Sequence, residues 1–137
     1  MAKIKLEIIT PERVLLQQDV DEVQIPTQRG EIGILPGHTP LISQLALSGL
    51  VKYRADGTLG RAVVGKGFVE ISSDKVTILS SLAELPQEID IASARRELES
   101  AERNLKNAEK DLSINVEEAL VLVERASMRV RVMEREG

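Results

Sequence analysis

The spacing of apolar residues changes once along this chain, close to Pro86. Before that point, apolar residues alternate with polar ones, most clearly at Ile4, Leu6 and Ile8. After it, they recur at intervals of three and four. Alternation is typical of a half-buried strand, and the 3-4 spacing places residues on one face of a helix. The sequence therefore predicts an α+β chain, with a β domain over residues 1–86 and helices over 87–137.

Turn signals divide the first part into many short strands. Asp56-Gly57 predicts a tight hairpin turn between the predicted strands 50–54 and 61–64, because glycine tolerates a positive φ. Segments 68–71 and 76–79 are expected to pair as a second hairpin. Short strands at such close spacing predict an antiparallel sandwich or barrel.

Two helices with narrow apolar stripes are expected after Pro86. Asp90 is the predicted N-cap of the first helix, and Asn115, followed three residues later by Glu118, that of the second. The first stripe consists of Ile91, Ala94, Leu98, Ala101, Leu105, Ala108 and Leu112, and the second of Val116, Ala119, Val123, Ala126, Val130 and Met133. Striped helices joined by a short turn predict an antiparallel hairpin. Because many stripe residues are alanines, which bury little surface, we expect this hairpin to be only marginally docked and able to rearrange.

Composition excludes several classes of function. With aromatic residues at 1% and a net charge of −4, the chain lacks the basic, aromatic surface of a nucleic-acid-binding protein. The absence of cysteine excludes disulfides and thiolate chemistry. No apolar run approaches the roughly 20 residues that span a bilayer, so membrane contact is expected only through a partner.

His38 is the one histidine, and it offers little for catalysis or metal binding. A metal site needs several ligands, and Glu31 is the one acidic residue close to it in sequence, so we expect no metal and no cofactor. A small hydrolase using His38 with Glu31 or Glu70 is an alternative, but no nucleophile motif supports it. The nearby glycines do not match a phosphate-binding loop.

Residues 30–41, Gly-Glu-Ile-Gly-Ile-Leu-Pro-Gly-His-Thr-Pro-Leu, resemble the G-x-x-G-x-x-P-G-H-x-P-L signature of the epsilon subunits of F-type ATP synthases. Further matches stand in the right order on both sides, among them Gly67-Phe68-Val69-Glu70-Ile71, and the helical hairpin follows at the family's place and length. The resemblance covers essentially the whole chain and is closest to the cyanobacterial and chloroplast branch.

The resemblance implies a non-catalytic rotor subunit with a β-sandwich and a C-terminal helix pair. Its expected partners are the gamma subunit and the c ring, and the alpha and beta subunits in an inhibited state. The segment expected to contact gamma and the c ring is a stiff loop that contains Gly30, Glu31, Gly33, Pro36, Gly37, His38 and Pro40. Its glycines are expected to allow sharp turns. The isolated chain is expected to be a monomer, and its complex to lie on the cytoplasmic or stromal face of a membrane such as the thylakoid.

Four arginines near the C-terminus admit two interpretations, which can both hold in different conformations. Arg125, Arg129, Arg131 and Arg135 can form a solvated helix face, favoured by the helix dipole. By resemblance they are also candidates for an inhibitory contact with an acidic segment of the beta subunit.

A nucleotide site on the helices is expected to be weak or absent. Some bacterial epsilon subunits bind ATP through a motif like [IL]-D-x-x-R-A, of which Asp90 and Ala94 are present here. Ser93 stands where that motif has arginine, so the guanidinium that would hold ATP is missing.

An alternative of a different class is a free-standing adaptor, in which a small β domain presents a helical hairpin to some other complex. Composition does not separate it from the rotor subunit, whereas the ordered motif matches favour the rotor subunit. Co-purification with a gamma subunit would distinguish the two.

Overall fold

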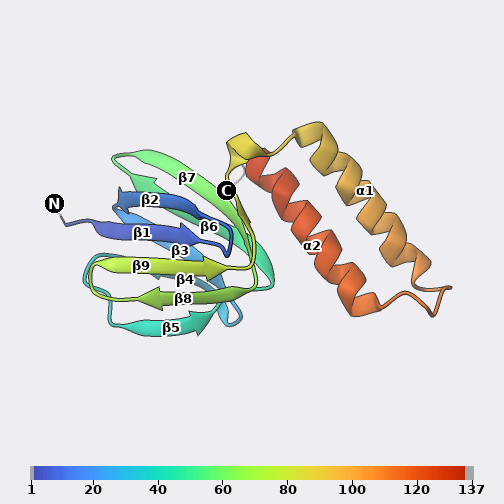
Figure 1. The fold of residues 1–137 in the computed structure, drawn as a ribbon, viewed down its shortest axis with the longest axis horizontal. Coiled ribbons are helices and arrows are strands. Elements are labelled where there is room, and N and C mark those ends of the chain that lie inside the picture. Colours follow the sequence, from blue (N-terminus) through green and yellow to red (C-terminus); the bar gives the residue numbers. More distant parts are fainter. Residues whose placement is uncertain (1, 135–137) are drawn as a thin grey trace. The chain divides into compact units, whose positions relative to one another are not determined.

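A computed structural model of the chain describes residues 2–134, which form two compact units divided between Leu85 and Pro86. Within the described residues, the first unit is a β-sandwich of two five-stranded sheets (Figure 1). The first sheet has the order β2 (Val14–Val20), β1 (Ile4–Ile9), β9 (Lys75–Ser80), β8 (Gly67–Ile71) and β5 (Leu41–Gln44). The second has the order β10 (Ala83–Glu84), β7 (Thr58–Gly65), β6 (Ser48–Ala55), β3 (Glu22–Thr27) and β4 (Gly30–Ile34).

Both predicted hairpins are confirmed. Strands β6 and β7 pair from Ser48 with Gly65 to Ala55 with Thr58, and the turn residues Asp56 and Gly57 have φ angles of 52° and 82°. Two successive positive φ angles give the turn that matches the natural twist of a hairpin. Strands β8 and β9 pair antiparallel as expected.

The predicted antiparallel sandwich is confirmed, and one strand pair within it is parallel. Strand β1 lies between β2 and β9 and runs parallel to β9, with Leu6 opposite Val76 and Ile8 opposite Ile78. Parallel neighbours need a long crossover connection, so no local turn signal marks them. The alternation of apolar residues predicts β1 itself, but it does not predict that β1 pairs with β9, which lies near the other end of the unit's sequence.

The core lies between the two sheets and is almost entirely aliphatic. Ile4, Leu6 and Ile8 of β1 are at most 1% exposed, which confirms the predicted inward face. Tyr53 of β6 is the one aromatic residue among the described core residues. A Cβ built on Gly60, its partner on β7, would fall on the Tyr53 ring, so the absence of a side chain at Gly60 makes room for the ring.

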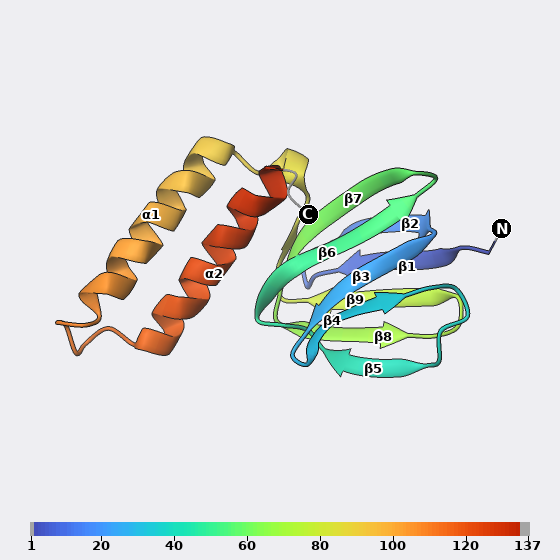
Figure 2. The same cartoon turned by 180° about the vertical axis from the view of Figure 1, so that it is seen from behind.

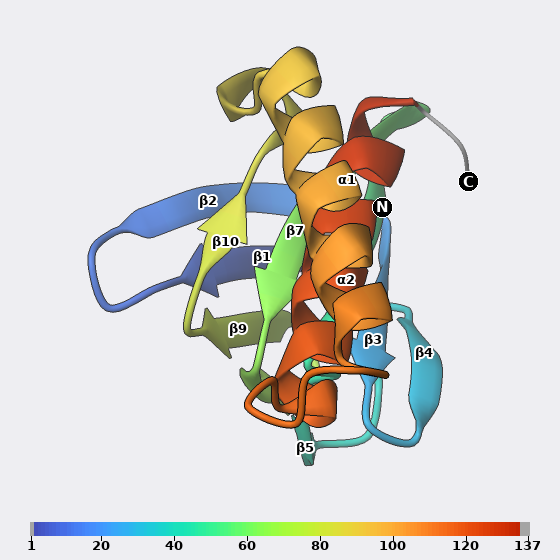
Figure 3. The same cartoon turned by 90° about the vertical axis from the view of Figure 1, so that its right-hand side faces the viewer.

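The second unit contains a short 3-10 helix, η1 (Pro86–Glu88), and, within the described residues, two α-helices, α1 (Ile91–Asn107) and α2 (Val116–Met133). These two helices lie side by side as the predicted hairpin (Figures 2 and 3). Both predicted caps are confirmed. Asp90 Oδ1 accepts from the backbone N–H groups of Ala92 and Ser93 at 3.0 and 3.3 Å, and Asn115 Oδ1 accepts from that of Glu118 at 3.0 Å.

Small residues dominate the contact between the helices, as the stripes predicted. Ala94 and Ala119 are at most 1% exposed and Ala126 is 4% exposed. Leu112 was wrongly placed on the first stripe, because α1 ends at Asn107 and Leu112 is 97% exposed. The Asp111 carboxylate accepts hydrogen bonds from the backbone and hydroxyl of Ser113, and such local bonding competes with helix.

Candidate functional site

The segment 30–40 does not form one loop, because the structure divides it between an edge strand and a connection. Gly30 to Ile34 form β4, at the edge of the second sheet, with Glu31 opposite Pro26 of β3. Ile32 and Ile34 alternate with Glu31 and Gly33, and Ile34 is only 2% exposed. Glu31 therefore lies on the outer face of the second sheet. Gly30 has the expected positive φ of 110°, whereas Gly33 lies inside the strand and makes no turn.

Residues 35–40 connect β4 to β5 and so pass from one sheet to the other, at the end of the sandwich opposite the β3–β4 turn (Figure 1). Gly37, with φ of 84°, donates its N–H to the Ser73 carbonyl in the β8–β9 turn at 2.6 Å. The His38 ring makes a hydrogen bond between Nδ1 and the Thr39 carbonyl at 2.6 Å, and the His38 backbone N–H donates to the Leu35 carbonyl at 3.2 Å. Local hydrogen bonds, among them that of the His38 ring, thus hold the connection.

The hydrolase alternative finds no support in this geometry. Glu31 lies on the outer face of the second sheet, whereas Glu70 of β8 lies on the outer face of the first, between buried Val69 and Ile71. The sandwich separates the two carboxylates, so they cannot share a site with His38. Over residues 2–134 there is also no cluster of three metal-ligating side chains.

An ion-pair network ties three segments together at the end of the sandwich where β1 begins. Lys3 Nζ lies 2.5 Å from Asp21 Oδ1 and 2.7 Å from Asp56 Oδ1, and Asp56 donates its backbone N–H to Asp21 Oδ2 at 2.8 Å. The hydrogen bond from Lys3 is the main cause that lowers the pKa of Asp21 below its usual value. The network joins the β2–β3 turn to the β6–β7 turn and thus links the two sheets.

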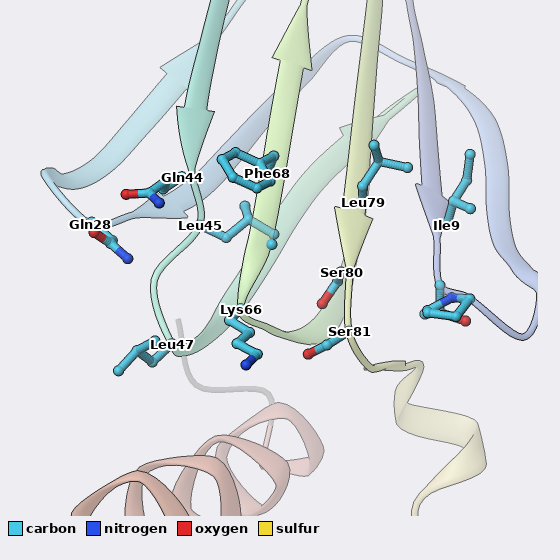
Figure 4. A pocket seen from close by; sticks show the side chains of 13 residues that line it. Ile9, Gln28, Gln44, Leu45, Leu47, Lys66, Phe68, Leu79, Ser80 and Ser81 are labelled. Carbon is cyan, nitrogen blue, oxygen red and sulfur yellow. The ribbon is translucent and has the colours of Figure 1, made fainter. Parts of the chain in front are cut away.

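An exposed apolar row crosses the outer face of the first sheet, and sequence reasoning missed it. Strand register places Val14, Ile9, Leu79 and Phe68 next to one another on β2, β1, β9 and β8. Val14, Leu79 and Phe68 are 53%, 46% and 51% exposed. Figure 4 shows Ile9, Leu79 and Phe68 side by side on their three strands. Ile42 of β5, 70% exposed, lies on the same face.

A cavity of about 600 Å³ adjoins this apolar row at the end of β1 and β9 (Figure 4). Its lining includes Ile9, Leu79 and Phe68 of the row, the fully buried Leu45, and Lys66, which precedes β8. An open cavity that continues an exposed apolar row enlarges the surface on which an apolar partner can be buried.

A charged pair borders the apolar row. Lys75 Nζ of β9 lies 2.8 Å from Glu7 Oε1 of β1. The hydrogen bond from Lys75 is the main cause that lowers the pKa of Glu7, and the same bond raises the pKa of Lys75. This arrangement, an apolar centre with a charged margin, is typical of protein–protein interfaces.

A signal for the apolar row was present in the sequence. Three of the four strands of the row carry two consecutive apolar residues, where alternation calls for one: Ile8-Ile9, Phe68-Val69 and Ile78-Leu79. In each pair one residue faces the core and the other faces solvent. An apolar side chain on the outer face of a strand does not contribute to the core. Three such side chains on neighbouring strands therefore predict a contact with another molecule.

The arginines of α2 differ in their surroundings. The Arg129 guanidinium forms an ion pair with the Glu97 carboxylate of α1. Arg131 is exposed, and its Nη1 donates to Met128 Sδ, three residues earlier on the same helix, at 3.8 Å. Arg125 is half-buried, and its Nε has no hydrogen-bond partner among residues 2–134. Arg135 lies outside the described residues.

Asp90 and Ala94, the two matches to the nucleotide motif, both have structural roles. The Asp90 carboxylate caps α1, and Ala94 is fully buried in the hairpin. In the described part of the chain, neither helix is long and apolar enough to cross a membrane.

Comparison with known proteins follows the same division of the chain. Residues 3–86 match the family described as ATP synthase, Delta/Epsilon chain, beta-sandwich domain. An ATP synthase epsilon chain of Carboxydothermus hydrogenoformans is 45% identical over 97 residues, which is 71% of this chain and 72% of that one. The epsilon chain of Caldanaerobacter subterraneus is 39% identical over 127 residues, 93% of this chain and 91% of that one.

A similar fold occurs in a solved structure. A chain in the OSCP, F1 and c-ring part of the Euglena gracilis mitochondrial ATP synthase superposes with a TM-score of 0.81. The match covers 98% of this chain and 83% of that one, at 24% identity.

Proposed function

Because the chain belongs to the family of ATP synthase epsilon chains, we propose that its sandwich binds the gamma subunit and the c ring and that its hairpin regulates the enzyme. Epsilon chains are non-catalytic subunits of the central stalk, and this chain is one of them. Its part in ATP synthesis is mechanical coupling within the rotor.

The observation that carries the proposed anchoring role is the apolar row on the outer face of the first sheet. Three of its side chains are about half exposed in the isolated chain, and two of them, Phe68 and Leu79, lie opposite each other on regularly paired strands. Burying the remaining half of each gives about 1 kcal/mol per side chain, from the roughly 1.5–3 kcal/mol of a complete burial. The row and the cavity beside it are our proposed gamma contact.

The edge strand β4 and the connection after it supply a second surface, which we assign to the c ring. Glu31 lies on the outer face of the second sheet, away from the apolar row, so two partners can be bound at once. Gly30, Gly33, Pro36, Gly37, His38 and Pro40 shape this surface through the backbone. A Glu31 ion pair with a basic loop adds only about 0–1 kcal/mol, so shape and buried area must provide most of the affinity.

Substitutions on the apolar row test the anchoring role. Phe68→Ala should weaken binding of the isolated gamma subunit about fivefold, and Phe68→Asp more strongly, because a carboxylate would be desolvated in the contact. Leu59→Asp is the matched control, since Leu59 is 73% exposed on β7 of the other sheet. Equal losses for Phe68→Asp and Leu59→Asp in a gamma-binding titration would refute the assignment of the row.

The hairpin is our proposed inhibitory element. When its helices separate and extend along the stalk, Arg125, Arg129, Arg131 and Arg135 become available to an acidic segment of the beta subunit and oppose rotation in the hydrolytic direction. The small, alanine-rich contact between α1 and α2 supports this, because such a contact costs little to open.

Nucleotide binding is not part of this regulation in our account. Ser93 replaces the arginine of the nucleotide motif, and the Asp90 carboxylate is occupied by two backbone N–H groups. Calorimetry of the isolated chain with ATP should show no saturation up to millimolar concentration. A saturating isotherm in that range would overturn this part of the proposal.

We further place the chain at the cytoplasmic or stromal face of an energy-transducing membrane, attached through its complex and monomeric when isolated. Membership of the cyanobacterial and chloroplast branch, with the thylakoid as its membrane, rests on the sequence resemblance alone. The relatives compared above come from other bacteria.

A further inference from the structure

Arg129 is the α2 arginine that the folded hairpin engages with a carboxylate of its own chain. Its Nη1 lies against Glu97 Oε2 of α1, and the arginine side chain is 19% exposed, compared with 59% for the glutamate. Glu97 lies three residues after the buried Ala94 on α1, and Arg129 three residues after the buried Ala126 on α2, so each lies one helical turn from the alanine contact. The guanidinium is therefore largely covered as long as the two helices stay together.

We propose that Glu97 is an intramolecular competitor, which occupies Arg129 in the folded hairpin in place of an acidic segment of a partner protein. A guanidinium binds carboxylates through a fixed fork of donors, so the same face of Arg129 cannot serve both acceptors fully. Separation of α1 and α2 exposes Arg129 and removes its internal carboxylate in one step. The pair thus couples opening of the hairpin to the availability of the arginine, and its regulatory consequence rests on the inhibitory role proposed above.

The expected effects are modest, because one partner is exposed to solvent. Ion pairs of this exposure change an equilibrium by about two- to fivefold. Glu97→Gln removes the charge while keeping the length and helix propensity of the side chain. Glu99→Gln is the matched control. Glu99 is an exposed glutamate on the same helix that forms no ion pair within the described part of the hairpin.

The first measurement needs the isolated full-length chain alone. The rate at which phenylglyoxal, an arginine reagent, modifies Arg129 can be followed by mass spectrometry. We expect Arg129 to react about two- to fivefold faster in Glu97→Gln than in the wild type or in Glu99→Gln. An unchanged modification rate of Arg129 in Glu97→Gln would overturn the inference, whether or not the chain inhibits ATP hydrolysis.

The second measurement adds the same full-length variants to F1 depleted of its epsilon subunit and records ATP hydrolysis. Glu97→Gln should inhibit at about two- to fivefold lower concentration, and Arg129→Gln at higher concentration, although both changes loosen the same hairpin. Changes in the same direction would mean that the pair only stabilises the hairpin, and would overturn the competition. The double variant Glu97→Arg with Arg129→Glu should restore slow hydrogen exchange of the helices without restoring inhibition.

The modification rate of Arg129 and the inhibition of ATP hydrolysis test the masking of Arg129 and the inhibitory function separately. If Arg129 reacts faster in Glu97→Gln but the wild-type chain does not inhibit hydrolysis, the proposed inhibitory function fails and the masking of Arg129 stands. If the wild-type chain inhibits but Arg129 reacts equally in both chains, the inhibitory function stands and the masking fails.

Discussion

A methyl group at Gly60 tests how the sandwich accommodates its one tyrosine. Gly60 of β7 is opposite Tyr53 of β6, and a Cβ at Gly60 would fall on ring atoms Cε2 and Cζ. Tyr53 is only 9% exposed and belongs to the core, so the ring cannot move without repacking. We therefore predict that Gly60→Ala destabilises the sandwich.

The magnitude follows from two opposing effects. Overpacking a core costs about 1–3 kcal/mol, whereas replacing a strand glycine by alanine gains about 0.5–1 kcal/mol in backbone entropy. The net loss is thus near 1 kcal/mol, which lowers the melting temperature of a unit of this size by roughly 4–8 °C.

The assay is favourable because Tyr53 is the one tyrosine in a chain without tryptophan. Thermal unfolding followed by tyrosine fluorescence reports on the sandwich alone, and the near-ultraviolet circular dichroism of the native state reports on the ring itself. Gly33→Ala is the matched control, because no heavy atom lies within 4 Å of a Cβ built on Gly33. Equal stability of Gly60→Ala and the wild type, with an unchanged tyrosine spectrum, would refute this account of the packing.

Two further predictions concern the hairpin and the ion-pair network. Asp90→Ala should destabilise α1 by about 1 kcal/mol, which hydrogen exchange would show as faster exchange of the amides in the first turn of the helix. Asp90→Ser should retain the protection of these amides, because serine also caps helices. Equal exchange rates in the two variants would argue against the cap. The hydrogen bond from Lys3 lowers the pKa of Asp21 in the folded chain below the value near 3.8 of the unfolded chain. The ionised Asp21 carboxylate therefore stabilises the fold above pH 3.8, and this stabilisation is lost as pH falls through the lower, folded pKa. Asp21→Asn should accordingly lower the free energy of unfolding at pH 7 and reduce its further decrease on acidification. Denaturant unfolding at pH 7 and pH 3 measures both changes. An undiminished decrease at pH 3 would show that other carboxylates dominate the acid sensitivity.

Local signals in the sequence predicted much of the fold. Alternation identified the inner face of β1, Asp56-Gly57 identified the β6–β7 turn, and Asp90 and Asn115 identified the helix starts. Each of these features depends on residues that are neighbours in sequence, so the chain itself carries the information.

What escaped prediction depends on distant residues. The parallel pairing of β1 with β9 joins opposite ends of the sandwich sequence, and no turn marks it. The apolar row exists only once β2, β1, β9 and β8 are in register, although its residues were visible as apolar neighbours within single strands. The pair between Glu97 and Arg129 likewise depends on how two helices are packed, which their stripes alone do not specify.

The most direct test of the central claim is the ATP hydrolysis rate of epsilon-depleted F1 after addition of the full chain or of a chain truncated after Pro86. The core cluster of the sandwich lies entirely before this point, so the truncated chain should fold. We predict that both chains bind F1 and that only the full chain slows hydrolysis. Failure of both to bind would contradict the rotor-subunit account, and equal inhibition by both would contradict the regulatory role of the hairpin.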